Sequence, residues 1–306
     1  MRVLVLVIVS FDKPVYYDML QVWRERNNRF DSVDGCVTDV WFIQCKSDAE
    51  WVGDIVNDIG EPLRSSPMTP PLCGQSQSQS ISDFESLGSQ SLCDRFELDI
   101  ANKTLFIRGD ECLIPGILHK TVEALSFFLH HSALLEPSFN SMGLSEAEYD
   151  EFPLFIWRTN LSSVLDFEGL QRYLGTINLS GVYGGYIGLG SLNNGSSTFF
   201  ASGAGFLMSR DVAEYLVKNK QFLRWDLIDD VAIGALLEPK FGIVPIDRCW
   251  VQTGSEDISA LIANGIFHFR CESYQHLRTV EFMQYVKRII EVNGSQCSMD
   301  FVDGLC

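Results

Sequence analysis

Apolar runs alternate with amphipathic segments along most of this chain, a pattern typical of an α/β protein. Residues 2–10 form a continuous, valine-rich run, as expected of a parallel strand that is buried on both faces. Residues 17–24 have the spacing of a helix, and residues 38–45 predict a second strand. The order strand, helix, strand predicts a Rossmann-like nucleotide-binding half.

The same alternation continues to the C-terminal region. Residues 96–100 and 104–107 flank a short turn and predict a β-hairpin. Further strands are expected at 152–157, 183–190, 199–207, 242–246 and 266–270, and further helices at 117–129, 166–174, 210–217, 229–237 and 280–292. We therefore expect one domain over residues 1–306, with a mostly parallel central sheet and helices on both faces.

One stretch, residues 61–92, departs from this pattern. Serine, glutamine, proline and glycine dominate it, and it has few large apolar side chains to anchor it in a core. It is expected to be a flexible surface insertion rather than a domain boundary.

Charge and cysteine content narrow the class of protein. A formal net charge of −17 argues against nucleic acid as a partner, and it requires a local basic patch or a cation beside any anionic substrate. The nine cysteines include no pair at CxxC spacing, which favours reduced thiols over a zinc site. Residues 3–9 are too short an apolar run to span a bilayer. We expect a cytoplasmic protein without a membrane span.

Candidate chemistry gathers in residues 199–247. The small residues 202–205 predict a turn where the backbone approaches a ligand closely. Asp229 and Asp230 stand together at the start of a predicted helix. From the residues alone, Asp229 is better explained as an N-cap and Asp230 as a complement to the helix dipole than as catalytic groups.

Four segments, taken together, resemble the fringe and β-galactosyltransferase-like family of inverting GT-A glycosyltransferases. Residues 152–174, FPLFIWRTNLSSVLDFEGLQRYL, correspond to the strand, metal motif and helix of that family. Residues 200–212, FASGAGFLMSRDV, resemble its S-G-G-G-Y-x-L-S-R-D segment. Residues 229–234, DDVAIG, resemble E-D-V-x-V-G, and residues 267–270, FHFR, lie where the family has a late histidine. The first three segments also look like predicted glycosyltransferases of large DNA viruses, whose location would be the host cytoplasm.

This resemblance implies a GT-A fold and transfer of a hexose from a nucleotide-sugar, a UDP-sugar, to a glycan or protein-linked acceptor. Asp230 would be the base, with Asp229 beside it and with helix-start amides favouring its charged form. Gly203, Ala204 and Gly205 would pass close to the donor. Residues 183–190 are then either a plain edge strand or a wall on which sugar rings stack.

Two further donor-binding residues are predicted from position alone. Ser10 and Phe11 follow the first strand, and ligands of open α/β sheets bind at the carboxyl ends of strands. They are candidates for contact with uridine.

The metal motif departs from the family. Asn160 and Ser162 stand where D-x-D carboxylates would bind a divalent cation, and neutral oxygens bind Mg²⁺ or Mn²⁺ more weakly. Either a metal binds through Asn160, Ser162 and His268, or Arg158, Arg270 or Lys120 supplies part of the positive charge. Arg158 is also a candidate for binding the nucleotide-sugar donor.

Two other hypotheses stay open at this point. A catalytically inactive GT-A domain that binds carbohydrate or mediates assembly would also lack D-x-D. A different Rossmann-like transferase, such as a methyltransferase, is less well supported because no glycine-rich loop follows the first strand, and the absence of GxGxxG argues against NAD.

Overall fold

The fold is described from a computed structural model. The structure describes residues 1–10, 13–27, 36–47, 50, 95–131, 154–192 and 195–300, with residues 294–300 described by their backbone alone. The predicted insertion at 61–92 lies outside these residues.

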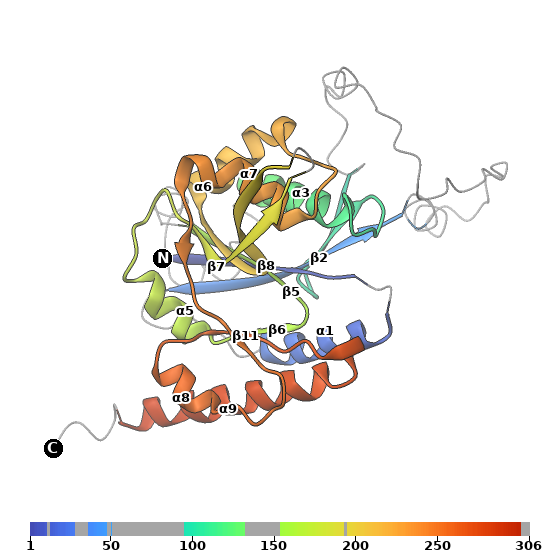
Figure 1. Cartoon of the computed structure of the whole chain (residues 1–306). Coiled ribbons are helices and arrows are strands. Elements are labelled where there is room, and N and C mark those ends of the chain that lie inside the picture. The colour runs from blue at the N-terminus through green and yellow to red at the C-terminus, as the bar shows by residue number, and fades with distance from the viewer. Residues whose placement is uncertain are drawn as a thin grey trace.

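An eight-stranded sheet forms the centre of the molecule (Figure 1). Its order is β3 (Phe96–Asp99), β4 (Thr104–Arg108), β2 (Val37–Lys46), β1 (Arg2–Ile8), β5 (Leu154–Asn160), β8 (Ser197–Ser209), β7 (Tyr183–Ser191), β9 (Val244–Pro245). The pairings of β1 with β2 and β5, of β2 with β4, and of β7 with β9 are parallel. Those of β3 with β4, β5 with β8 and β7 with β8 are antiparallel.

A second, three-stranded sheet lies below the first in Figure 1. It consists of β10 (Cys249–Trp250), β11 (His268–Arg270) and β6 (Ser163–Leu165), in that order. Because β6 follows β5 almost directly, this small sheet brings β11 close to the carboxyl end of β5.

Helices cover both faces of the large sheet (Figure 1). On one face lie α3 (Gly116–His130), α6 (Arg210–Lys218) and α7 (Asp229–Phe241), with the 3₁₀ helix η5 (Lys220–Phe222). On the other lie α1 (Val15–Asn27), α5 (Phe167–Leu174), α8 (Ile258–Ala263) and α9 (Thr279–Asp300), with η6 (Tyr274–His276). The predicted α/β class, with a large, mostly parallel sheet between helices, is confirmed.

Strand β1 shows why a continuous apolar run folds this way. Leu4, Leu6 and Ile8 pack toward α3 and α6, whereas Val3 and Val5 pack toward α1 and α9. Successive side chains of a strand point to opposite faces, so a strand with helices on both sides must be apolar at every position.

Residues 202–205 are not the turn that the sequence predicts. They lie within β8, between Ala201, which pairs with Ile187, and Phe206, which pairs with Gly185. Four residues of β8 therefore lie opposite one residue of β7, Tyr186, in a wide bulge. A bulge of this kind interrupts the ladder and frees backbone groups for other partners.

Two further properties concern the whole described chain. The cysteines at 36, 45, 112, 249 and 271 are free. Within the described residues, no helix is long and apolar enough to cross a membrane.

Candidate functional site

The bulge in β8 lies against the first turn of α7, and Asp230 joins the two. The Gly203 amide donates to Oδ2 of Asp230 at 2.8 Å, and the Val231 amide donates to Oδ1 at 2.9 Å. Burial raises the pKa of Asp230 and the charge of Asp229 raises it further, while the Gly203 amide and Arg158 lower it. The helix-start amide of Val231 favours the charged form, as the sequence predicts, but the cost of burying the charge exceeds its effect.

Asp229 has a different environment from its neighbour. It is the first residue of α7, after the N-cap Ile228, so the N-cap interpretation of Asp229 is wrong. Its Oδ2 lies 2.5 Å from Nη2 of Arg158, whose side chain is only 3% exposed and which also donates to the Gly203 carbonyl. Among the described residues, Arg158 thus pairs with Asp229 and not with Asp230.

The D-x-D positions form a network with an arginine. The guanidinium of Arg270 donates to Oδ1 of Asn160 and to Oγ of Ser162, and its second Nη donates to Glu272. The hydroxyl of Ser163 donates to the same Oδ1 of Asn160 at 3.2 Å. The two oxygens that the resemblance assigns to a metal therefore already contact a cation.

His268 lies behind this network, in the interior. It is 1% exposed, and burial, followed by the charges of Arg248 and Arg270, lowers its pKa to about 3. Its Nε2 is 3.3 Å from Oγ of Ser163. The ring is therefore neutral. A role for Asn160, Ser162 and His268 as metal ligands stays a prediction, and the described residues contain no cluster of three or more His, Cys, Asp or Glu side chains suited to a metal ion.

The small residues of the bulge have distinct surroundings. A Cβ on Gly205 would lie 2.6 Å from Cε1 of His268, so this glycine makes room for an interior ring. A Cβ on Gly203 would lie 3.2 Å from both Nη1 of Arg158 and Oδ2 of Asp230. The carbonyl of Ala204 accepts hydrogen bonds from Thr159 at 2.7 Å and from Ser163 at 3.1 Å. The bulge is thus tied to β5 and β6.

Arg248 belongs to the site but was not predicted. Its Nη1 donates to Oγ of Ser202 at 2.9 Å. Its guanidinium carbon lies 4.4 Å from the ring centroid of Tyr186 and 5.4 Å from that of Trp250. Tyr186 is 47% exposed and Trp250 is 43% exposed, each counted over the whole residue. One feature of the sequence could have indicated Arg248. It follows the predicted strand at 242–246 and stands two residues before Trp250.

Ser10 lies one strand away, at the carboxyl end of β1 beside the end of β5. Its hydroxyl donates to Glu111 at 3.1 Å. Lys120, which the sequence suggested as a possible source of positive charge for a phosphate, is completely buried and contacts the carbonyl of Val9 at 2.8 Å and Glu111 at 2.6 Å. It is not a solvated helix residue, because its side chain is 0% exposed, and a role toward a phosphate stays a prediction. Phe11 lies outside the described residues.

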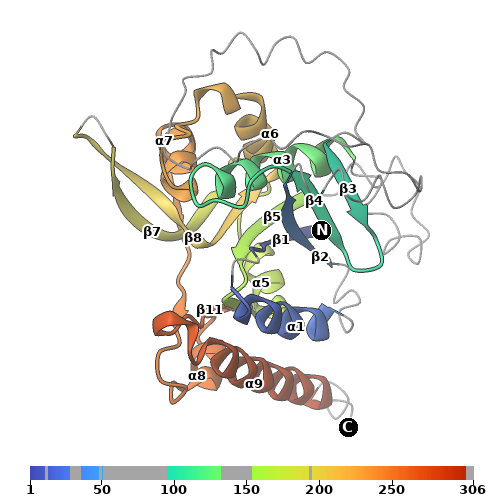
Figure 2. The ribbon, with the colours of Figure 1, turned by 90° about the vertical axis from the view of Figure 1, so that its right-hand side faces the viewer.

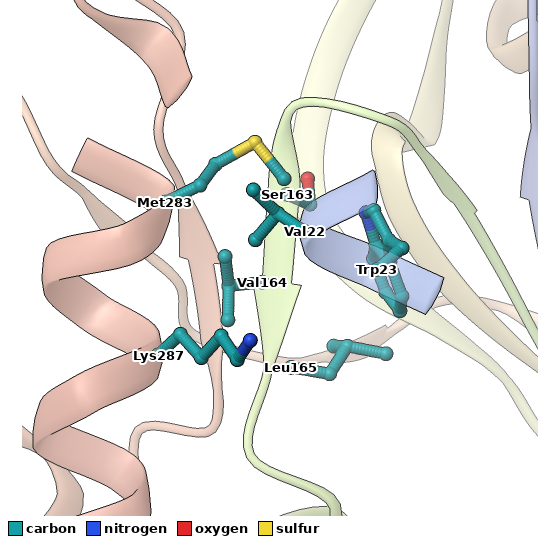
Figure 3. A pocket seen from close by; sticks show the side chains of 7 residues that line it. All are labelled: Val22, Trp23, Ser163, Val164, Leu165, Met283 and Lys287. Atoms are coloured by element: carbon teal, nitrogen blue, oxygen red, sulfur yellow. The ribbon is translucent and has the colours of Figure 1, made fainter. Parts of the chain in front are cut away.

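A small cavity lies between β6, α1 and α9 (Figure 3). It measures about 10 Å³ and is lined by Val22, Trp23, Ser163, Val164, Leu165, Met283 and Lys287. This space suits a single water molecule at most. We therefore do not assign a substrate to it.

Comparison with known proteins adds little to this geometry. No protein-family model and no curated protein matches the sequence. Among solved structures, the apo form of mouse xyloside xylosyltransferase 1 is similar at 9% sequence identity, over 88% of this chain and 96% of that chain, with a TM-score of 0.33. A likeness of this size carries no argument about the site.

Proposed function

We propose that this protein is an inverting glycosyltransferase that moves a hexose from a UDP-sugar to a hydroxyl of a glycan or glycoprotein. The observation that carries the proposal is Asp230, a half-buried carboxylate of raised pKa that the charges of Arg158 and Arg248 reach, with Arg270 acting on Arg248 in turn. The motif resemblance supports the same assignment.

The reaction needs what these residues supply. The acceptor oxygen forms a bond to the anomeric carbon as the bond from that carbon to the diphosphate oxygen breaks, and the diphosphate leaves with the electron pair. Asp230 accepts the proton of the acceptor hydroxyl. A raised pKa makes its carboxylate a stronger base, provided that it is ionised at the working pH. Arginine side chains stabilise the negative charge that develops on the leaving group.

Asp230 is a better candidate for the base than Asp229. Oδ2 of Asp229 is held in a buried ion pair with Arg158, so this oxygen is not open to an acceptor hydroxyl. Asp230 accepts its hydrogen bonds from two backbone amides, those of Gly203 and Val231. A positioned carboxylate with free lone pairs suits proton transfer.

Two exposed rings beside the site support a carbohydrate acceptor. Tyr186 and Trp250 both contact the guanidinium of Arg248, which is hydrogen-bonded to Ser202 next to Gly203. Aromatic faces bury the apolar face of a sugar ring, while the arginine offers donors to its hydroxyls. Residues 183–190 do form a strand, and Tyr186 within it presents the kind of surface expected of a sugar-stacking wall.

Replacing Trp250 with alanine should raise the acceptor KM about tenfold and change kcat much less, because stacking contributes to binding in the ground state and the transition state alike. Steady-state kinetics with a panel of aryl glycoside acceptors measures this. Trp250→Phe, which keeps a ring, should retain most of the affinity, and Phe222→Ala, which removes an exposed ring from η5, is the matched control. An unchanged KM in Trp250→Ala would exclude this surface as the acceptor site.

A second candidate function, a non-catalytic carbohydrate-binding module, is favoured by one observation. Arg270 contacts the two oxygens, of Asn160 and Ser162, that would otherwise be open to a catalytic metal. The exposed rings of Tyr186 and Trp250 would serve such a module equally well.

The proposed function is tested by incubating the purified full chain with UDP-glucose, UDP-galactose, UDP-xylose and UDP-N-acetylglucosamine, with and without Mn²⁺, and measuring UDP release. Release with at least one donor, enhanced by an acceptor and giving a product of inverted anomeric configuration by NMR, supports it. The absence of both turnover and binding with every donor of the panel would contradict the proposed function.

A further inference from the structure

The D-x-D positions of this chain do not have the chemistry of a divalent-metal site. Mg²⁺ and Mn²⁺ prefer carboxylate oxygens, whereas Asn160 and Ser162 offer neutral ones. Both oxygens accept hydrogen bonds from Arg270, and a metal ion would have to displace that guanidinium. His268 is directed at Ser163 in the interior, 1% exposed. The donor set fits a guanidinium better than a metal.

Arg270 is fixed where it lies. It extends from β11, which pairs with β6 in the register Arg270 opposite Ser163, immediately after the D-x-D positions. Its side chain is only 12% exposed, and Glu272 accepts from its second Nη. Glu272 is 34% exposed, so this carboxylate lies on the solvent side of the guanidinium.

A second guanidinium, that of Arg248, lies close enough to Arg270 for the charge of Arg270 to act on it, and it is hydrogen-bonded to Ser202, next to the Gly203 carbonyl that Asn160 contacts. Burial lowers the pKa of Arg248, and the positive charge of Arg270 lowers it further. Within the described part of the chain, the contacts of Arg248 are a serine hydroxyl and two aromatic rings, and its side chain forms no ion pair with a carboxylate. Two partly desolvated like charges repel each other, and an anion bound between them would relieve that repulsion.

We infer that Arg248 and Arg270 bind the diphosphate of the donor in place of a divalent metal ion. This inference rests on the proposed function and specifies how its leaving group is stabilised. Two guanidinium groups present several N–H donors in a planar arrangement that matches phosphate oxygens, and unlike a metal they need no carboxylate ligands. The chain has a net charge of −17, which repels an anion at long range. A local pair of cations attracts the anion at the site itself.

The test is calorimetric binding of UDP and of uridine to the full chain, first with excess EDTA and then with Mn²⁺. We expect UDP to bind with the same affinity, within about twofold, in both conditions. Arg248→Gln and Arg270→Gln should each weaken UDP binding by about 10- to 100-fold, the loss expected for a charge-assisted contact, and weaken uridine binding far less. Arg224→Gln, which removes an exposed arginine on another segment, is the matched control and should bind UDP normally.

The outcomes separate this inference from the function on which it rests. UDP binding that is lost in EDTA and restored by Mn²⁺ would overturn the inference and leave a glycosyltransferase intact. Binding of UDP that survives EDTA but is unaffected by both substitutions would also overturn it. The absence of UDP binding in every condition would overturn the proposed function as well. The wild-type comparison in EDTA needs no variant, so it decides the metal question even where a substitution impairs folding.

Discussion

Replacing Asp230 with asparagine should lower the rate of sugar transfer by about 10²- to 10⁴-fold and leave UDP binding within a few-fold of wild type, because the amide cannot accept the acceptor proton. The asparagine carbonyl can still accept the Gly203 amide hydrogen bond, so the hydrogen bond between the bulge and residue 230 of α7 is kept. Single-turnover rates together with calorimetric UDP affinities measure the two effects separately.

The controls for this prediction decide between enzyme and module. Asp226→Asn, which changes an exposed aspartate just before α7, should keep full activity. A non-catalytic module would bind sugars equally well with either residue at 230 and would show no turnover to lose. Equal transfer rates in wild type and Asp230→Asn would exclude Asp230 as the base.

The pH dependence of the wild-type rate provides an independent check on Asp230. Because the base must be unprotonated, kcat/KM should fall as the pH decreases through the pKa of Asp230. Burial and Asp229 raise this pKa, so the acid limb should lie above the range of an ordinary aspartate. A rate that is flat down to the pH of an unperturbed aspartate would contradict the assignment.

The second large effect concerns stability. Replacing Arg158 with methionine should lower the free energy of unfolding by about 3–5 kcal/mol at neutral pH, the usual cost of leaving one partner of a buried ion pair alone. Asp229 would remain buried with an uncompensated charge, and the Gly203 carbonyl would lose a donor. Urea denaturation followed by circular dichroism measures the change.

A double substitution separates charge from packing. Arg158→Met combined with Asp229→Leu removes both charges and should recover much of the lost stability. Arg210→Met, which removes an exposed i,i+4 pair with Glu214, should cost about 1 kcal/mol or less. If Arg158→Met were as mild as Arg210→Met, the ion pair of Arg158 and Asp229 would not have the structural role assigned to it.

Sequence reasoning located the principal strands and helices because their apolar periodicity reflects burial directly. Strand β1, apolar at every position, is the clearest case. The strands β9 and β10 have two residues each, too few to show an apolar period. The strand predicted at 242–246 is therefore shorter in the structure, Val244–Pro245, and β10 was not predicted. The glycine-rich residues 202–205 suit a turn and a bulge equally, and only the register against β7 distinguishes the two.

The grouping of the candidate residues was predictable where it rests on motifs and not where it rests on tertiary contacts. The resemblance brought Arg158, Asn160, Ser162, Gly203 and Asp230 together, and the structure places them in one network. The pairing of Lys120 with Glu111 depends on how α3 packs against the ends of β1 and β2, which no local pattern reveals. The contacts of Arg248 with Ser202 and Tyr186 join distant segments in the same way.

The bulge in β8 divides this strand into two parts with different neighbours. On the N-terminal side of the bulge, β8 forms with β7 a long hairpin that extends away from the rest of the sheet (Figure 2), and the hairpin packs on α7, where Gly234 leaves room for Phe200. On the C-terminal side of the bulge, β8 also pairs with β5, the strand of Arg158 and Asn160. Within the bulge, the Gly203 amide donates to Asp230 of α7 and the Gly203 carbonyl accepts from Arg158 of β5, so one residue of backbone connects the helix with the sheet. A longer or shorter bulge would therefore change the distance between the carboxylate of Asp230 and the guanidinium of Arg158.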